Sequence, residues 1–128
     1  MQYICNCKKN NIFDKSYTYW EDRNVTTDEL DIINYLENNK DIKFKSILHI
    51  GIGNSYFAKK FASRSNIMGI TISQKEVKKA ESMNLVNYRP FLLDKYSIQF
   101  KNFLNKNKFD LIVDTNLKSY SCCQEAFE

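Results

Sequence analysis

Four short apolar runs, separated by segments of helical periodicity, constrain the fold of this 128-residue chain most strongly. The clearest run is Ser-Ile-Leu-His-Ile at residues 46–50, and the turn Gly51-Ile52-Gly53 follows it directly. A run of this length before glycines predicts a strand that is buried on both faces. The other three runs predict further strands and cover residues 67–72, 88–93 and 109–113.

Helical patterns fill the intervals between these runs. The first helix is marked by the capping box Thr26-Thr27-Asp28-Glu29, in which we expect the Thr26 hydroxyl to accept from the Glu29 amide and the Glu29 carboxyl to bond back to Thr26. A second capping box spans residues 73–76 and opens the helix after the second strand. The predicted helices cover residues 26–39, 56–62, 73–80 and 98–104.

Strands that alternate with helices indicate a parallel sheet with helices on both faces. We therefore predict an α/β protein with an open, doubly wound parallel sheet. Residues 26–128 would form this domain, and residues 1–25 an irregular, aromatic-rich N-terminal arm. Because the pattern stops after the fourth strand, we expect a sheet that is truncated there or that covers its open edge by forming a homo-oligomer.

Composition argues against several other classes of protein. No apolar run approaches the roughly 20 residues that cross a bilayer, and the N-terminus lacks the pattern of a signal peptide, so we expect a cytoplasmic chain with reduced cysteines. The net charge of +4 comes from interspersed charges and does not indicate a nucleic-acid partner. The pairs Cys5/Cys7 and Cys122/Cys123 lack the usual spacing of zinc ligands, so we expect no metal site.

Open parallel sheets bind their ligands at the carboxyl ends of the strands. The turn Gly51-Ile52-Gly53-Asn54-Ser55 would lie there, where glycine lets a ligand approach the backbone and the next helix offers free amides. A dinucleotide motif would need a third glycine where Tyr56 stands, and no P-loop lysine follows, so both of those sites are disfavoured. Further polar residues expected at or near this edge are His49, Thr71, Ser73, Asp94 and Asp114.

Taken together, four segments resemble the N-terminal, cofactor-binding half of class I S-adenosylmethionine (SAM)-dependent methyltransferases. Residues 47–55 resemble the first motif of that family, residues 69–76 the motif after it, residues 92–94 the end of the third strand, and residues 109–114 the fourth strand. The resemblance implies a Rossmann-like fold, SAM as the cofactor, and methyl transfer to an acceptor that these residues do not identify. The cofactor-binding residues that it implies are His49, Gly51, Gly53, Asn54, Thr71, Ser73, Asp94 and Asp114.

The resemblance also implies individual roles. Asp94 would bind the adenine amino group, Thr71 a ribose oxygen, and Asp114 would lie beside the transferred methyl group. His49 stands where the family usually has an acid that helps to hold the methionine ammonium, and Ser55 replaces a third glycine. A neutral imidazole could accept a hydrogen bond from the ammonium, whereas a protonated one would repel it.

Several of these residues also have a purely structural interpretation. His49 could be a core histidine, Asp94 could cap the turn before Ser97, and Asp114 could bind its own loop. The functional alternatives are a non-catalytic SAM-binding remnant or accessory subunit, and an enzyme that cleaves SAM without an acceptor. Aromatic residues that we expect in the core rather than in the site are Tyr56, Phe57 and Phe61.

Overall fold

Residues 25–39, 41 and 43–115 are described in a computed structural model of the chain. Nearly all of the predicted N-terminal arm and all four cysteines lie outside these residues. Within the described ranges, no helix is long and apolar enough to span a membrane.

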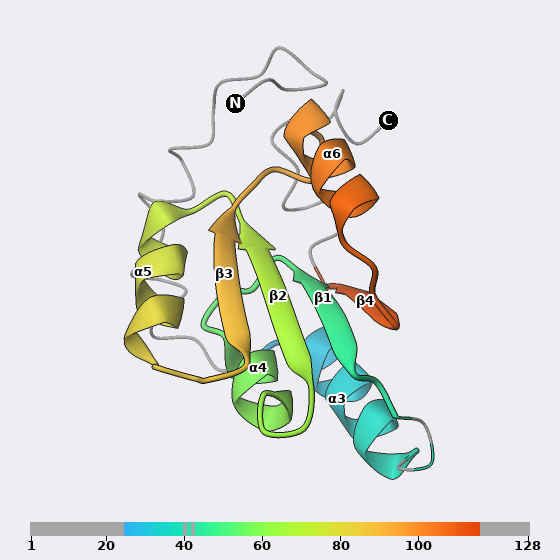
Figure 1. Cartoon of the computed structure of the whole chain (residues 1–128). Coiled ribbons are helices and arrows are strands. Elements are labelled where there is room, and N and C mark those ends of the chain that lie inside the picture. The colour runs from blue at the N-terminus through green and yellow to red at the C-terminus, as the bar shows by residue number, and fades with distance from the viewer. Residues whose placement is uncertain (1–24, 40, 42, 116–128) are drawn as a thin grey trace.

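The four predicted strands form one parallel sheet, with strand order β3-β2-β1-β4 (Figure 1). Because β4 returns to the far side of β1, the connection reverses direction between β1 and β4, and this is the switch point of the sheet. The α/β prediction is therefore confirmed. The strands are β1 (Ser46–Ile50), β2 (Asn66–Thr71), β3 (Tyr88–Leu92) and β4 (Leu111–Asp114).

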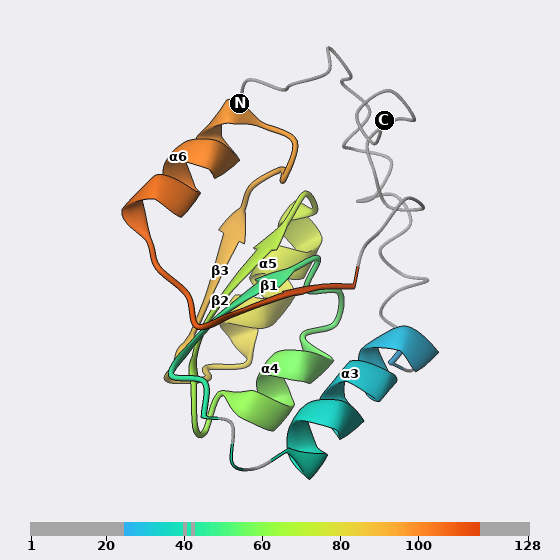
Figure 2. The same cartoon turned by 90° about the vertical axis from the view of Figure 1, so that its right-hand side faces the viewer.

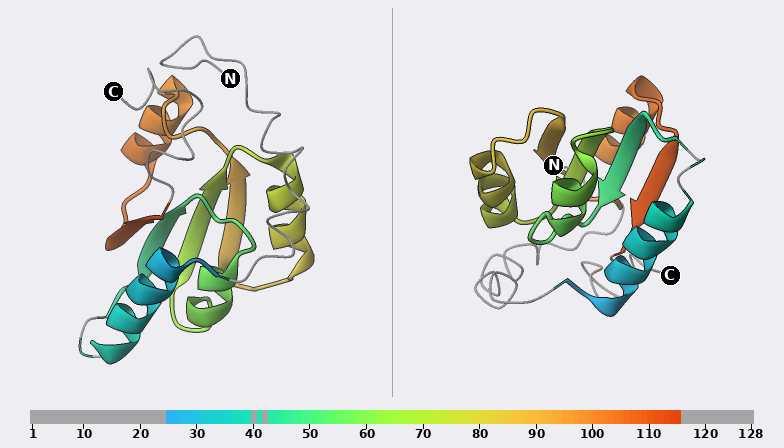
Figure 3. Two further views of the ribbon diagram at one scale, coloured as in Figure 1. Left: turned by 180° about the vertical axis from the view of Figure 1, so that it is seen from behind. Right: turned by 90° about the horizontal axis from the view of Figure 1, so that it is seen from below.

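Helices cover both faces of the sheet, which confirms that it is doubly wound. In Figure 2, α6 lies on one side of the sheet, and α3 and α4 lie on the other. The view from behind shows α3 and α4 in front of the strands (Figure 3, left). The four helices are α3 (Thr27–Asn38), α4 (Tyr56–Phe61), α5 (Gln74–Ser82) and α6 (Ile98–Lys106).

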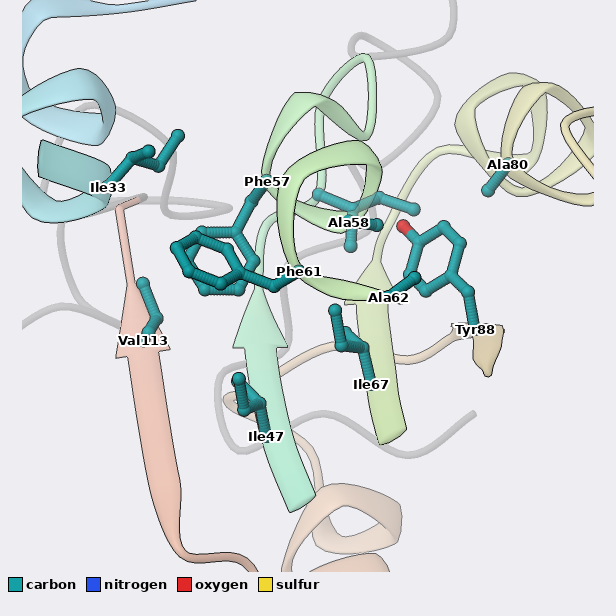
Figure 4. Close-up of a cluster of buried hydrophobic side chains, with 11 residues drawn as sticks. Ile33, Ile47, Phe57, Ala58, Phe61, Ala62, Ile67, Ala80, Tyr88 and Val113 are labelled. Atoms are coloured by element: carbon teal, nitrogen blue, oxygen red, sulfur yellow. The ribbon is translucent and has the colours of Figure 1, made fainter. Parts of the chain in front are cut away.

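The larger core lies between the sheet and helices α3, α4 and α5 (Figure 4). The rings of Phe57 and Phe61 of α4 pack at a tilt of 36° with centroids 4.7 Å apart, and Phe57 is fully buried. Full burial of one such side chain contributes about 1.5–3 kcal/mol to folding. The prediction that the α4 aromatics belong to the core is confirmed for both phenylalanines, and Tyr56 is partly buried against the same cluster.

The smaller core lies on the α6 face, where Leu48 and Ile50 of β1 pack with Ile70 of β2. Phenylalanines of α6 cover this cluster, including Phe103, which stands edge-on to Phe91 of β3. The sheet is covered less completely beside β4, where Ile112 remains 53% exposed.

The fourth strand begins two residues later than the sequence pattern predicted. Phe109 packs against the smaller core, and the Asp110 carboxylate accepts hydrogen bonds from the amides of Lys45 (2.8 Å) and Ser46 (3.1 Å). These contacts fix residues 109 and 110 at the amino edge of the sheet, so the ladder with β1 starts only at Leu111.

Candidate cofactor-binding site

The carboxyl edge of the sheet collects the predicted site residues. Gly51 and Gly53 follow β1, Thr71 ends β2, Asp94 lies two residues beyond β3, and Asp114 ends β4. Four separate strands thus bring to one edge residues that are far apart in the chain. These side chains differ, however, in whether their polar atoms already have hydrogen-bond partners within the protein.

The turn after β1 has three residues with positive φ: Gly51 (79°), Gly53 (53°) and Ser55 (62°). The Gly51 amide donates to Ile70 O at 2.8 Å, which ties the turn to β2. A Cβ at Gly53 would meet no atom within 4 Å, so the space beside this glycine is open among the described residues. The positive φ favours glycine there, and the open space lets a ligand approach the backbone.

Ser55 stabilises the turn from within the protein, where its side chain is buried. It is fully buried in the left-handed conformation, and its hydroxyl is 2.8 Å from the Tyr88 hydroxyl. The Tyr88 ring passes over Gly69, where an added Cβ would collide with Ile52 and press on the tyrosine. Burial raises the pKa of Tyr88, so the phenol remains protonated and holds the turn against β3.

At the end of β2, Thr71 is linked to an acid that the resemblance did not assign. The Thr71 hydroxyl donates to Glu76 Oε1 at 2.6 Å and accepts from the Ser73 amide at 3.1 Å. Ser73 caps α5 by accepting from the Glu76 amide at 3.3 Å. Glu76 is buried, so the capping box predicted from the sequence brings a carboxylate to the end of β2.

Asp94, beyond β3, is both a turn residue and a buried acceptor. Its Oδ1 accepts from the Tyr96 amide at 2.8 Å, and its carbonyl accepts from the Ser97 hydroxyl at 2.7 Å. The residue is only 2% exposed, and Oδ2 has no hydrogen-bond partner among the described residues. Burial raises the pKa of this carboxyl. The structural interpretation thus accounts for one oxygen and leaves the other available to a donor.

His49 is fully buried, and its ring centroid is 4.8 Å from that of Phe57. Its Nε2 lies 3.4 Å from Thr115 Oγ1 and 3.6 Å from Glu29 Oε1, while Nδ1 has no hydrogen-bond partner among the described residues. Burial lowers the pKa of His49 to about 4, so the imidazole is neutral at pH 7.

Glu29, in the first turn of α3, is a site residue that the sequence reasoning missed. The Thr26 hydroxyl does accept from the Glu29 amide, at 3.2 Å, so that half of the predicted capping box is confirmed. The other half is wrong, because the Glu29 carboxyl lies against His49 instead of bonding back to Thr26. Burial raises the pKa of Glu29 to about 7.

Asp114 is held by a side chain from the neighbouring loop. Lys95 Nζ lies 3.0 Å from its Oδ2, and the two side chains are 15% and 30% exposed. This pair joins the loop after β3 to the end of β4. Asn54 is partly buried within the glycine turn. No group of three or more metal-ligating side chains occurs within residues 25–39, 41 and 43–115.

Comparison with known proteins supports the fold. No protein-family model matches the sequence, and no curated protein matches it either. A solved structure does match: a crystal structure assigned as a caffeoyl-CoA O-methyltransferase from Staphylococcus aureus, with a TM-score of 0.54 and 21% sequence identity. The match covers 82% of this chain and 52% of that chain. The chain has a methyltransferase-like fold.

The resemblance to class I methyltransferases is thus confirmed at the level of the fold, with a parallel sheet in the order 3-2-1-4. The chain spans about half the length of the protein that it matches. At this identity the match establishes architecture, and the chemistry has to be argued from the residues of this chain.

Proposed function

We propose that this chain binds SAM along the carboxyl edge of its sheet and that the protein transfers the SAM methyl group to an acceptor. The observation that carries the proposal is Asp94 Oδ2, a buried carboxylate oxygen with no partner among the described residues. Leaving such a group unpaired costs about 1–3 kcal/mol, which a ligand donor can recover. An adenine amino group is a donor of the kind that fits this position.

The other groups along the edge fit the rest of the same ligand. Beside Asp94, the end of β2 offers the Thr71 hydroxyl and the Glu76 carboxylate, which are suited to ribose hydroxyls. Next to them, the turn after β1 offers open space beside Gly53. The order β3, β2, β1 of the sheet therefore matches the order adenine, ribose, sulfonium and methionine along SAM.

The chemistry asked of the protein is modest. SAM supplies an activated sulfonium whose methyl group can be displaced in line, so the chain's residues need only bind, orient and shield the reacting atoms. Asp94 and the Thr71–Glu76 pair would fix the nucleoside, and the turn after β1 would fix the chain that carries the sulfonium. Asp114 at the end of β4 would lie nearest the methyl group, next to the switch point.

Calorimetry with SAM and with its demethylated product tests binding directly. Asp94→Asn is the informative variant, since its side-chain oxygen can still accept from the Tyr96 amide while its NH₂ replaces Oδ2 and faces the adenine donor. We expect the affinity for both ligands to fall by about tenfold or more. The matched control is Asp110→Asn, which changes an aspartate at the opposite edge of the sheet and should leave affinity unchanged.

Two results would overturn the proposal. Absence of binding by the unaltered chain at millimolar SAM would exclude a SAM site, and equal affinities for Asp94→Asn and Asp110→Asn would place the adenine elsewhere. Product analysis after incubation with SAM alone distinguishes the alternatives. A transferase leaves SAM intact until an acceptor is added, an acceptor-independent enzyme cleaves it, and a binding remnant never consumes it.

A further inference from the structure

The switch point between β1 and β4 contains a buried acid and a buried imidazole in contact. Glu29 Oε1 and His49 Nε2 are 3.6 Å apart, too far for a good hydrogen bond. Among the described residues, Glu29 Oε1 and His49 Nδ1 have no hydrogen-bond partner, although both atoms are buried. Polar atoms buried in this way are uncommon and costly in native proteins, so the pair calls for a functional explanation.

The hydrogen-bond acceptors around the pair indicate a cationic ligand rather than an anion. A carboxyl oxygen and a hydroxyl both lie close to one imidazole nitrogen: Glu29 Oε1 is 3.6 Å and Thr115 Oγ1 is 3.4 Å from His49 Nε2. All three can accept hydrogen bonds, and among the described residues no lysine or arginine pairs with the Glu29 carboxyl. A primary ammonium has three N–H donors and one positive charge, which matches this set of acceptors. The Glu29 side chain keeps 13% of its surface exposed, so the pair lies close to the protein surface although Oε1 itself is buried.

We propose that Glu29, positioned against His49, is the acidic group of a subsite that binds the primary ammonium of the methionine end of SAM. This inference rests on the proposed function and assigns the negative charge to α3 instead of to β1. The position along the edge agrees, because Asp94 lies beyond β3 at one end and the Glu29–His49 pair lies at the switch point beyond β2. A ligand with its adenine at Asp94 then extends its amino-acid end over β1 toward Glu29.

The protonation of the pair supports the same assignment. With the pKa of Glu29 near 7 and that of His49 near 4, the pair carries little charge in slightly acidic solution. The groups around Glu29 are His49 from β1, the Thr115 hydroxyl after β4, and Tyr88 from β3, with which Glu29 interacts electrostatically. None of these is a cation at pH 7, so within the described part of the chain an arriving ammonium would be the first positive charge to stabilise the Glu29 carboxylate.

Calorimetry with two ligands tests the inference on the full chain. SAM carries the ammonium, and 5′-methylthioadenosine retains the nucleoside and the sulfur but lacks the amino-acid end. Glu29→Gln should weaken SAM binding by about tenfold or more and change 5′-methylthioadenosine binding by less than about twofold. Asp28→Asn is the matched control, because it removes one negative charge from the same helical turn at an exposed side chain. It should alter neither affinity.

The outcomes separate the inference from the proposed function. If the unaltered chain binds SAM and Glu29→Gln binds it equally well, the subsite is wrong and the proposed function stands. Equal losses for SAM and 5′-methylthioadenosine would make Glu29 a structural residue and also overturn the subsite. If the unaltered chain binds only 5′-methylthioadenosine, the nucleoside site survives without an ammonium subsite. Binding of neither ligand overturns both proposals.

Discussion

The two ends of the carboxyl edge are built in different ways. At the ends of β2 and β3, polar groups are held by short local hydrogen bonds, such as Thr71 to Glu76 (2.6 Å) and Ser97 to the Asp94 carbonyl (2.7 Å). The turn after β1 is held by the Ser55–Tyr88 hydroxyl pair (2.8 Å). At the switch point between β1 and β4, His49 and Glu29 are buried against each other at 3.6 Å without a strong bond. The first region is a hydrogen-bonded frame that leaves Asp94 Oδ2 open, whereas at the second a carboxyl oxygen and an imidazole nitrogen are both buried without a partner among the described residues.

This difference follows from how the groups reach the site. The β2 and β3 groups sit in capping boxes and turns, where partners lie within a few residues of one another and geometry is set locally. Glu29 and His49 come from α3 and β1, 20 residues apart, and meet only when the helix packs on the sheet. We infer that the nucleoside end of the site is preorganised and that the switch point is completed by its ligand.

The largest expected effect that distinguishes the regions is the pH dependence of folding at the switch point. Between pH 4.5 and 6.5, the native state keeps a proton on Glu29, whereas the unfolded state keeps one on His49. The two states bind equal numbers of protons at this pair, so the pH dependence that the two residues give to the free energy of unfolding cancels in this range. Replacing either residue should reveal the pH dependence that the remaining one gives to stability, and the two dependences should run in opposite directions.

In Glu29→Gln, only the lowered pKa of His49 remains, so stability is full above pH 6.5 and falls as the pH drops toward 4. In His49→Gln, only the raised pKa of Glu29 remains, so stability is full below pH 4.5 and falls as the pH rises toward 7. Each change should be on the order of 2–3 kcal/mol in the free energy of unfolding. Urea unfolding across pH 4–8 measures it, and parallel profiles for the two variants would show that these residues do not titrate as described.

Substitutions in the hydrogen-bonded frame, at the Ser55–Tyr88 pair, should change the free energy of unfolding by less and without pH dependence. Tyr88→Phe leaves the buried Ser55 hydroxyl without its partner and should lower the free energy of unfolding by about 1–2 kcal/mol. Ser55→Ala should cost a similar amount, and the double variant should cost less than the sum of the two. Urea unfolding at pH 5 and pH 8 provides the check. Additive costs, or a cost that differs between the two pH values, would contradict a satisfied hydroxyl pair.

Most of the fold could be predicted from the sequence because its signals are local. The apolar run at residues 46–50, the glycines after it and the capping boxes each specify an element within a few residues. The start of β4 was misplaced because Asp110 binds the Lys45 and Ser46 amides, which are more than 60 residues away. Periodicity contains no information about such a contact.

The candidate site divides in the same way. The positions of Gly51, Gly53, Thr71 and Asp94 at one edge follow from the strand pattern alone. The contact between Glu29 and His49 does not, because a glutamate at the third residue of a helix has an adequate local role in a capping box. Only the packing of α3 on the sheet shows that this carboxyl is turned inward.

The smallest effect should come from the ion pair that joins the two regions. Lys95, in the loop after β3, lies 3.0 Å from Asp114 at the end of β4. Partly exposed pairs contribute about 0.2–1 kcal/mol and are screened by salt. Lys95→Met should therefore lower the free energy of unfolding by about 0.5 kcal/mol in dilute buffer and by less in about 1 M salt.

Arg64→Met is the matched control, since Arg64, just after α4, pairs with Glu37 of α3 at 2.6 Å and both side chains are more exposed than those of Lys95 and Asp114. If the two ends of the edge fold as one unit, both variants lose similar, small amounts of stability. A loss above about 2 kcal/mol for Lys95→Met alone would mean that the loop after β3 depends on β4 for its conformation. The nucleoside end would then not be preorganised independently of the switch point, and the contrast between the two regions would fail.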